Sequence, residues 1–106
     1  MNPVTRSDIV IVRSFMQQAA VNTRFSTWQI EAEAVGSRYD ITATYDRVNR
    51  RLVVALVNFR TCWEFNSTVH WDYVAEKLNL SRPDAQAVAL IINEIHEEIR
   101  ASCPSS

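Results

Sequence analysis

The sequence predicts an α+β fold: an N-terminal helix, an antiparallel β-meander of three to four strands, and two C-terminal helices packed mainly on one face of the sheet. Three observations support this prediction. Polar and apolar residues alternate through residues 25–45, which is typical of half-buried strands. Apolar residues recur at helical spacing near both ends of the chain. Residues 52–59, between these regions, form the densest apolar and β-branched run.

Length and composition favour a single domain covering residues 1–106. A chain of 106 residues, of which 47% are hydrophobic, can bury a core without metal or disulfide support. We expect only the ends, residues 1–5 and 102–106, to fray. The single glycine, Gly36, argues against a glycine-rich phosphate loop or a flexible linker.

The first expected element is a helix that follows a cap at Thr5 or Ser7 and ends near residues 21–22. Its buried stripe is predicted from i, i+3, i+4, i+7 spacing, at Val12, Phe15, Met16 and Ala19. The ends of the chain would then both contribute helices that pack on the central strands.

The expected strands follow in order. Residues 25–35 and 39–45 alternate in polarity and are joined by a tight turn at Gly36. A second turn, with Asn49 as the expected positive-φ residue, leads to the strand at residues 52–59. That strand is apolar on both faces, so the helices, the segment around Trp63 or a second subunit should cover its second face. Residues 62–65 are interpreted as a short fourth strand, with a loop that plugs the core as the alternative.

Two helices should complete the fold. The first follows the cap-forming residues 66–68 and stops near Asn79. The second runs from about residue 82 to residue 101, with Ser81 as its N-cap and Asp84 in its first turn. Its apolar side carries the main stripe of the chain: Val88, Ile92, Ile95 and Ile99.

Residues 73–92 resemble a helix-turn-helix, the DNA-binding motif in which the second helix enters the major groove. The expected recognition helix, however, offers Asp84 and Gln86, then apolar residues, then Glu94, Glu97 and Glu98. Phosphates would be repelled by such a helix. The element order is also that of double-stranded RNA-binding domains, but residues 66–73 contain no lysine or arginine. Both resemblances predict nucleic-acid binding only as an alternative function.

The charge distribution keeps that alternative open. Residues 1–60 carry 8 arginines and 5 acidic residues, whereas residues 61–106 carry 3 basic and 7 acidic residues, and the net charge is -1. A basic face would arise if the arginines of the sheet converged. The candidates are Arg38, Arg47, Arg50, Arg51 and Arg60.

No pattern in the sequence predicts an enzyme, a metal site or a cofactor. Cys62 is expected to be a buried core thiol and His96 to lie on a solvated helix face. His70 and His96 are not spaced as metal ligands. The sequence contains no GxSxG, Walker or HExxH motif. We therefore expect no catalytic residues.

The aromatic residues between positions 59 and 73 favour a binding function, because tryptophan and tyrosine dominate protein interfaces. The last helix also carries more apolar surface than a small sheet covers. The candidate interface residues are Trp63, Phe65, Trp71, Tyr73, Leu90 and Ile91.

These observations predict a small, non-catalytic protein–protein interaction or regulatory protein that forms a homodimer. It would be an adaptor, a chaperone-like binder or an inhibitor of a bacterial or phage target. The element order is loosely similar to that of small secretion chaperones, which are also acidic and dimeric. The absence of a signal-peptide pattern or a long apolar run predicts a cytoplasmic protein without a membrane partner.

Overall fold

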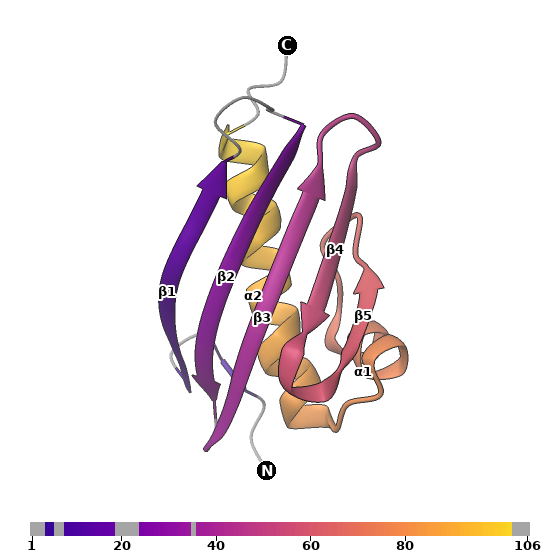
Figure 1. Cartoon of the computed structure of the whole chain (residues 1–106). Helices are drawn as coiled ribbons and strands as arrows, with labels where there is room; N and C mark the ends of the chain where they lie inside the picture. The colour runs from indigo at the N-terminus through magenta and orange to yellow at the C-terminus, as the bar shows by residue number, and fades with distance from the viewer. Residues whose placement is uncertain (1–3, 6–7, 19–23, 35, 103–106) are drawn as a thin grey trace.

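The chain folds as a five-stranded antiparallel meander followed by two helices (Figure 1). The computed structural model describes residues 4–5, 8–18, 24–34 and 36–102. The strands occur in the sheet in chain order: β1 (Ile9–Gln18), β2 (Phe25–Ala34), β3 (Ser37–Asp46), β4 (Arg51–Leu56) and β5 (Thr61–Glu64). A 3₁₀ turn, η2 (Val57–Phe59), joins β4 to β5, and the helices are α1 (Trp71–Leu78) and α2 (Arg82–Ser102). The predicted α+β class and the antiparallel meander followed by two helices are confirmed, but the sheet has five strands and not three to four, because residues 9–18 add a strand.

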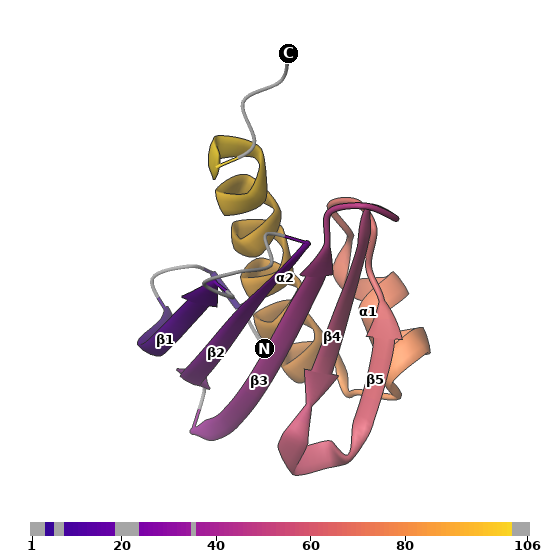
Figure 2. The ribbon, with the colours of Figure 1, turned by 45° about the horizontal axis from the view of Figure 1, so that its top comes forward.

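Both helices lie on the same side of the sheet. Figures 1 and 2 show α2 running behind the central strands and α1 beside β5 on that side. We call this side the inner face, and the opposite side, which no helix of the described chain covers, the outer face. The outer residues of β2 and β3 are mostly polar, as expected for a sheet with one solvated face.

The predicted N-terminal helix is wrong, because residues 9–18 form strand β1 instead. This strand pairs with β2, and its register shifts between Arg13 and Phe15. A β-bulge adds a residue to one strand and breaks the alternation of period two. The apolar positions Val12, Phe15 and Met16 therefore imitated helical spacing. The β-branched residues 9–12, which are typical of a strand, are the signal that could have predicted β1. The expected stripe residue Ala19 and the expected helix end lie outside the described residues.

This correction removes the helix-first element order on which two resemblances depended. Double-stranded RNA-binding domains and small secretion chaperones were similar only if a helix preceded the meander. A five-stranded meander followed by two helices lacks that order.

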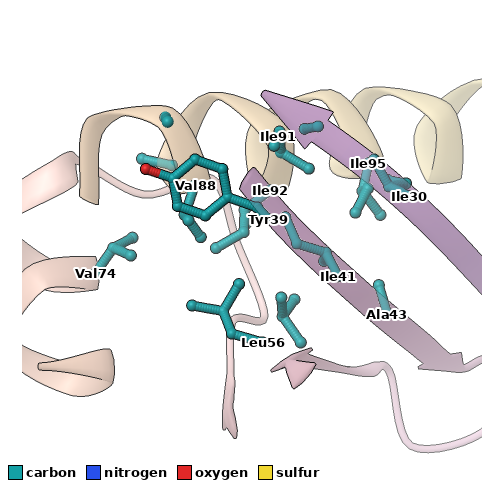
Figure 3. Packing of buried hydrophobic residues seen from close by; sticks show 14 of the residues in the cluster. Ile30, Tyr39, Ile41, Ala43, Leu56, Val74, Val88, Ile91, Ile92 and Ile95 are labelled. Carbon is teal, nitrogen blue, oxygen red and sulfur yellow. The ribbon is translucent and has the colours of Figure 1, made fainter. Parts of the chain in front are cut away.

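The core lies between the inner face of the sheet and α2. Figure 3 shows isoleucines and Tyr39 from the sheet pointing toward the apolar side of α2. Each fully buried side chain of this kind stabilises the fold by about 1.5–3 kcal/mol. The largest buried side chains are Trp28, Tyr39, Phe65, Ile41, Leu52, Leu56, Ile91, Ile92, Ile95, Val54, Val74 and Val88. Val4, which we expected to fray, is also buried, and its N–H donates to the Gln86 Oε1 at 3.1 Å.

The start of α2 is fixed much as its sequence predicts. The backbone N–H of Ala85 donates to the Ser81 carbonyl at 2.8 Å, and the Ser81 hydroxyl donates to Asp84 at 2.9 Å. The hydroxyl of buried Tyr39 donates to the other oxygen of Asp84. Burial, with this hydrogen bond, raises the pKa of Tyr39. The first turn of α2 is thereby joined to the middle of the sheet.

The β3–β4 turn has a different geometry from the one expected. The left-handed residue is Arg50, with φ of 55°, and not Asn49. The Asp46 carboxylate accepts hydrogen bonds from the backbone N–H groups of Val48 and Asn49 and forms an ion pair with Arg24 at 3.0 Å. Hydrogen bonding from Arg24 holds the pKa of Asp46 far below its usual value. Asn49 donates to Asp46 through its side chain, so it orders the turn without adopting positive φ.

Candidate protein-interaction surface

Strand β5 forms one edge of the sheet and is its most exposed strand among those with described side chains. It begins after Arg60, which closes η2 in a left-handed conformation with its N–H bonded to the Val57 carbonyl at 3.3 Å. At the other end, the N–H of Phe65 donates to Leu52 at 2.8 Å, and the N–H of Leu52 donates to the Asn66 side chain at 3.0 Å. The short fourth strand expected near residues 62–65 is therefore present, as β5.

The register of β4 and β5 decides which side chains share a face. Trp63 lies opposite the buried Val54, so its side chain belongs to the inner face. Cys62 lies opposite Ala55, and Glu64 lies opposite Val53. These four residues belong to the outer face, because successive side chains of a strand point to opposite sides.

Trp63 extends beyond the helix-covered core and contacts α1. Its indole N–H donates a long hydrogen bond of 3.4 Å to the Tyr73 hydroxyl. The Lys77 ammonium lies 5.0 Å from the Trp63 ring centroid and 5.6 Å from that of Tyr73, within cation–π range. The Tyr73 ring also meets the buried Phe65 ring edge-on at 6.0 Å. This cluster holds two large aromatic rings in place while leaving 44% of Trp63 and 41% of Tyr73 exposed.

An open depression of about 620 Å³ lies beside these rings. It brings together inner-face and outer-face residues at the free edge of the sheet. We call its lining the β5 surface: Val53, Cys62, Trp63, Glu64, Asn66 and Tyr73. Glu64 approaches Arg51 at 3.9 Å and accepts from Asn66 at 3.4 Å, so its carboxylate is only loosely held. The surface is thus an apolar and aromatic patch with one acidic group.

The six predicted interface residues do not form one surface. Phe65 and Ile91 are each only 1% exposed and belong to the core, because the sheet and α2 close over them. Trp71 and Leu90 are half-buried and line a separate depression of about 370 Å³, where the Arg82 guanidinium lies 5.0 Å from the Trp71 ring. Only Trp63 and Tyr73 lie in the β5 surface.

Sequence reasoning missed the contributions of Val53, Cys62 and Glu64 to this surface. No polarity pattern in residues 51–56 marks Val53 as outward, and only the two-residue period of a strand, which directs it away from its neighbours Leu52 and Val54, could have found it. The contributions of Cys62 and Glu64 depend on the register of β5. The prediction of a buried Cys62 is wrong, because the residue is exposed on the outer face of an edge strand.

The predicted basic face is also wrong. Arg47, Arg50 and Arg51 lie at the β3–β4 turn, whereas Arg38 and Arg60 lie near the opposite end of these strands. Arg38 forms ion pairs with Glu31 on the neighbouring strand β2 at 3.2 Å and with Asp40 on its own strand at 3.6 Å. The Arg47 side chain donates to Ser26. The five arginines therefore form no single site.

The expected recognition helix is the most buried helix segment of the protein. Residues 85–89 are all buried, and the polar residues before and among them are already used: Asp84 accepts from Tyr39 and Gln86 accepts from Val4. Buried residues 85–89 leave this part of α2 without an exposed side chain that could read base edges. The two helices and their turn are present, with left-handed Asn79 ending α1, but this geometry does not present α2 to a groove.

The two histidines have structural contacts. His96 is half-buried rather than solvated, and its Nε2 lies 2.6 Å from the Phe65 carbonyl, to which it donates. Burial lowers its pKa. His70 lies 2.8 Å from Asp72, and this hydrogen bond lowers the pKa of that carboxyl. Cys62 lines the β5 surface, which contains no histidine among its described lining residues.

The rest of the described chain adds no further chemical centre. In residues 4–5, 8–18, 24–34 and 36–102, no group of three or more histidine, cysteine, aspartate or glutamate side chains is arranged to hold a metal ion. No helix in those ranges is long and apolar enough to span a membrane. No family model, curated protein or solved structure matches this chain.

Proposed function

We propose that this chain is a non-catalytic protein-interaction domain that binds other protein chains through the β5 surface. The observation that carries the proposal is the pair of exposed rings, Trp63 and Tyr73, held rigidly beside the free edge of a sheet. Rings ordered in this way bind at low cost in conformational entropy, and tryptophan and tyrosine supply most hot spots of protein interfaces.

The position of the rings favours an extended partner segment. An edge strand offers unpaired N–H and C=O groups, so a partner strand can add to the sheet while its side chains contact neighbouring pockets. The depression beside Trp63 gives one apolar side chain a place to be buried, and Glu64 at its rim favours a basic neighbour. A catalytic function would need converging polar groups, and the lining offers one loosely held carboxylate, one thiol, and an Asn66 amide and a Tyr73 hydroxyl that already have hydrogen-bond partners.

Selection from a displayed library of random peptides tests the proposal directly. We expect the full chain to enrich peptides with alternating polarity, and the double variant Trp63→Ser, Tyr73→Ser to bind those peptides at least about 30-fold more weakly, which is the effect of losing a hot spot of about 2 kcal/mol. The matched control is Phe25→Ser with Val48→Ser, which removes two exposed apolar side chains away from β5, one on β2 and one in the β3–β4 turn.

Urea unfolding should show that both double variants remain folded. The proposal is wrong if the chain enriches no peptide at concentrations low enough to keep it monomeric, or if the enriched peptides bind the Trp63 and Tyr73 variant as tightly as the unchanged chain.

A further inference from the structure

The free edge of β5 presents its hydrogen-bonding groups at known positions. The Phe65 N–H donates to Leu52, so residues of the same parity, Thr61 and Trp63, direct their N–H and C=O groups toward β4. The intervening residues, Cys62 and Glu64, then direct theirs away from the sheet. An additional strand would pair with these two residues.

The charges at the two ends of this edge are opposite. Exposed Arg60 directly precedes β5, and Glu64 is its last residue. Such a strand is complementary to itself when a second copy approaches antiparallel, because the positive end of each copy then meets the negative end of the other. A parallel approach would place like charges together. The backbone of Arg60 has a left-handed conformation, so this residue lies just outside the regular hydrogen-bond ladder of β5. Its long side chain can still reach the β5 strand of a second copy.

We propose that the first partner of the β5 surface is a second copy of this chain, paired antiparallel through β5 about a two-fold axis at Cys62. This inference rests on the proposed function and names the partner. Arg60 faces the partner's Glu64, and the reverse contact repeats it across the axis. The two meanders become one continuous ten-stranded sheet with all helices on one face, in the manner of an isologous dimer.

This register has consequences for both faces. On the inner face, Trp63 lies opposite the partner's Thr61, which brings the aromatic clusters of the two copies together beneath the junction. On the outer face, Cys62 lies opposite the partner's Cys62 in a hydrogen-bonded pair, where Cα atoms are about 5.5 Å apart. That separation allows a disulfide. A register centred on Trp63 would place Cys62 opposite the partner's Glu64 and move the two thiols out of reach.

A charge exchange tests the pairing. We expect Arg60→Glu and Glu64→Arg each to weaken dimerisation about ten-fold in sedimentation equilibrium at low ionic strength, since each variant replaces two attractive contacts with two repulsive ones. The double variant should restore dimerisation, because the opposite charges still meet. Arg50→Glu is the matched control, since Arg50 is also an exposed arginine with a left-handed backbone conformation beside a strand.

Thiol oxidation tests the register. In a Cys103→Ser background, diamide should convert the dimer into a covalent one, with two Cys62 thiols losing their protons and two electrons to the diamide, which becomes a hydrazine. Cys62→Ser should abolish the covalent species and leave the reversible dimer intact.

The outcomes separate this inference from the proposed function. A chain that stays monomeric at high micromolar concentration yet selects peptides through Trp63 overturns the second-copy inference and leaves the proposed function standing. A dimer that ignores the charge reversals, or one whose Cys62 thiols do not couple, overturns the inferred pairing. Restoration by the double charge exchange together with rapid Cys62 coupling supports it.

Discussion

The two faces of strand β4 differ although the strand reads as uniformly apolar. Leu52, Val54 and Leu56 point to α2 and are at most 1% exposed, whereas the intervening Val53 is 37% exposed. The described chain has a single helical layer, and that layer can cover only one face of a sheet. The apolar side chain on the other face, Val53, therefore remains exposed at the surface. It lies next to the β5 edge, at which we propose that partners bind.

The largest expected effect comes from truncating the same residue type on either face. Val54→Ala should lower the free energy of unfolding by about 2–4 kcal/mol, because it leaves a cavity in a close-packed layer. Val53→Ala should lower it by less than about 1 kcal/mol, since solvent replaces the lost methyl groups. Urea denaturation of both variants measures the difference. Equal losses would show that the outer face is also covered.

The next effect concerns the link between the inner face and α2. Tyr39→Phe should destabilise the fold by about 1.5–2 kcal/mol, because Asp84 loses the hydroxyl that donates to it in a partly buried setting. Tyr73→Phe is the control, as its hydroxyl accepts only a long hydrogen bond at the exposed β5 surface. Thermal unfolding of the two variants should separate them clearly. A larger loss of stability for the Tyr73 variant would contradict the stabilising role of the Tyr39–Asp84 hydrogen bond.

A smaller effect is expected at the most deeply placed tryptophan. Trp28 is 2% exposed, and its indole N–H has no hydrogen-bond partner among the described residues. Trp28→Phe removes that buried donor together with some packing area, so the two changes offset each other and the loss should stay within about 1 kcal/mol. Trp28→Ala, which removes the same donor but also leaves a large cavity, is the contrasting variant. Urea denaturation measures both, and a loss for phenylalanine as large as that for alanine would indicate an essential N–H.

The smallest effect appears only as a change with pH. Burial lowers the pKa of His96, so the folded protein binds its proton less readily than the unfolded chain does. The neutral imidazole therefore contributes stability that is complete above the unfolded pKa of about 6.5 and is lost as the pH falls through the folded value. His96→Gln should flatten the slope of unfolding free energy between pH 7.5 and 5. An unchanged slope would mean that folding leaves the pKa of His96 unshifted.

Much of the fold was predictable from residues whose local preferences agree with their tertiary surroundings. Trp28, Ile30 and Ile41 alternate with polar residues, and their strands formed where expected. The Ser81–Asp84 cap placed the start of α2 correctly. Residues 9–18 were misread because the bulge after Arg13 interrupts the strand period, and a bulge is stabilised by pairing with β2 rather than by its own sequence.

The candidate site was predictable only in part. The exposed rings of Trp63 and Tyr73 were anticipated from composition, but Phe65 and Ile91 have the same chemistry and are buried. The neighbouring residues in the sequence do not distinguish an aromatic ring that is buried in the core from one that remains at the surface. Likewise, the arginines of the sheet were plausible as one face until the strand lengths separated them to opposite ends.

Local sequence was enough to place strands β2 to β4 and the apolar surplus of β4, since these depend on near neighbours in the chain. The β3–β4 turn was located correctly, but its positive-φ residue is Arg50 and not Asn49. Long-range packing decided three further properties. The helix α2 covers the inner face of β4, it is a core helix and not a DNA-recognition helix, and β5 ends the sheet beside two exposed rings. These properties depend on strand register and on the number of helices available for cover. Such long-range relations carry no signature in any single stretch of residues.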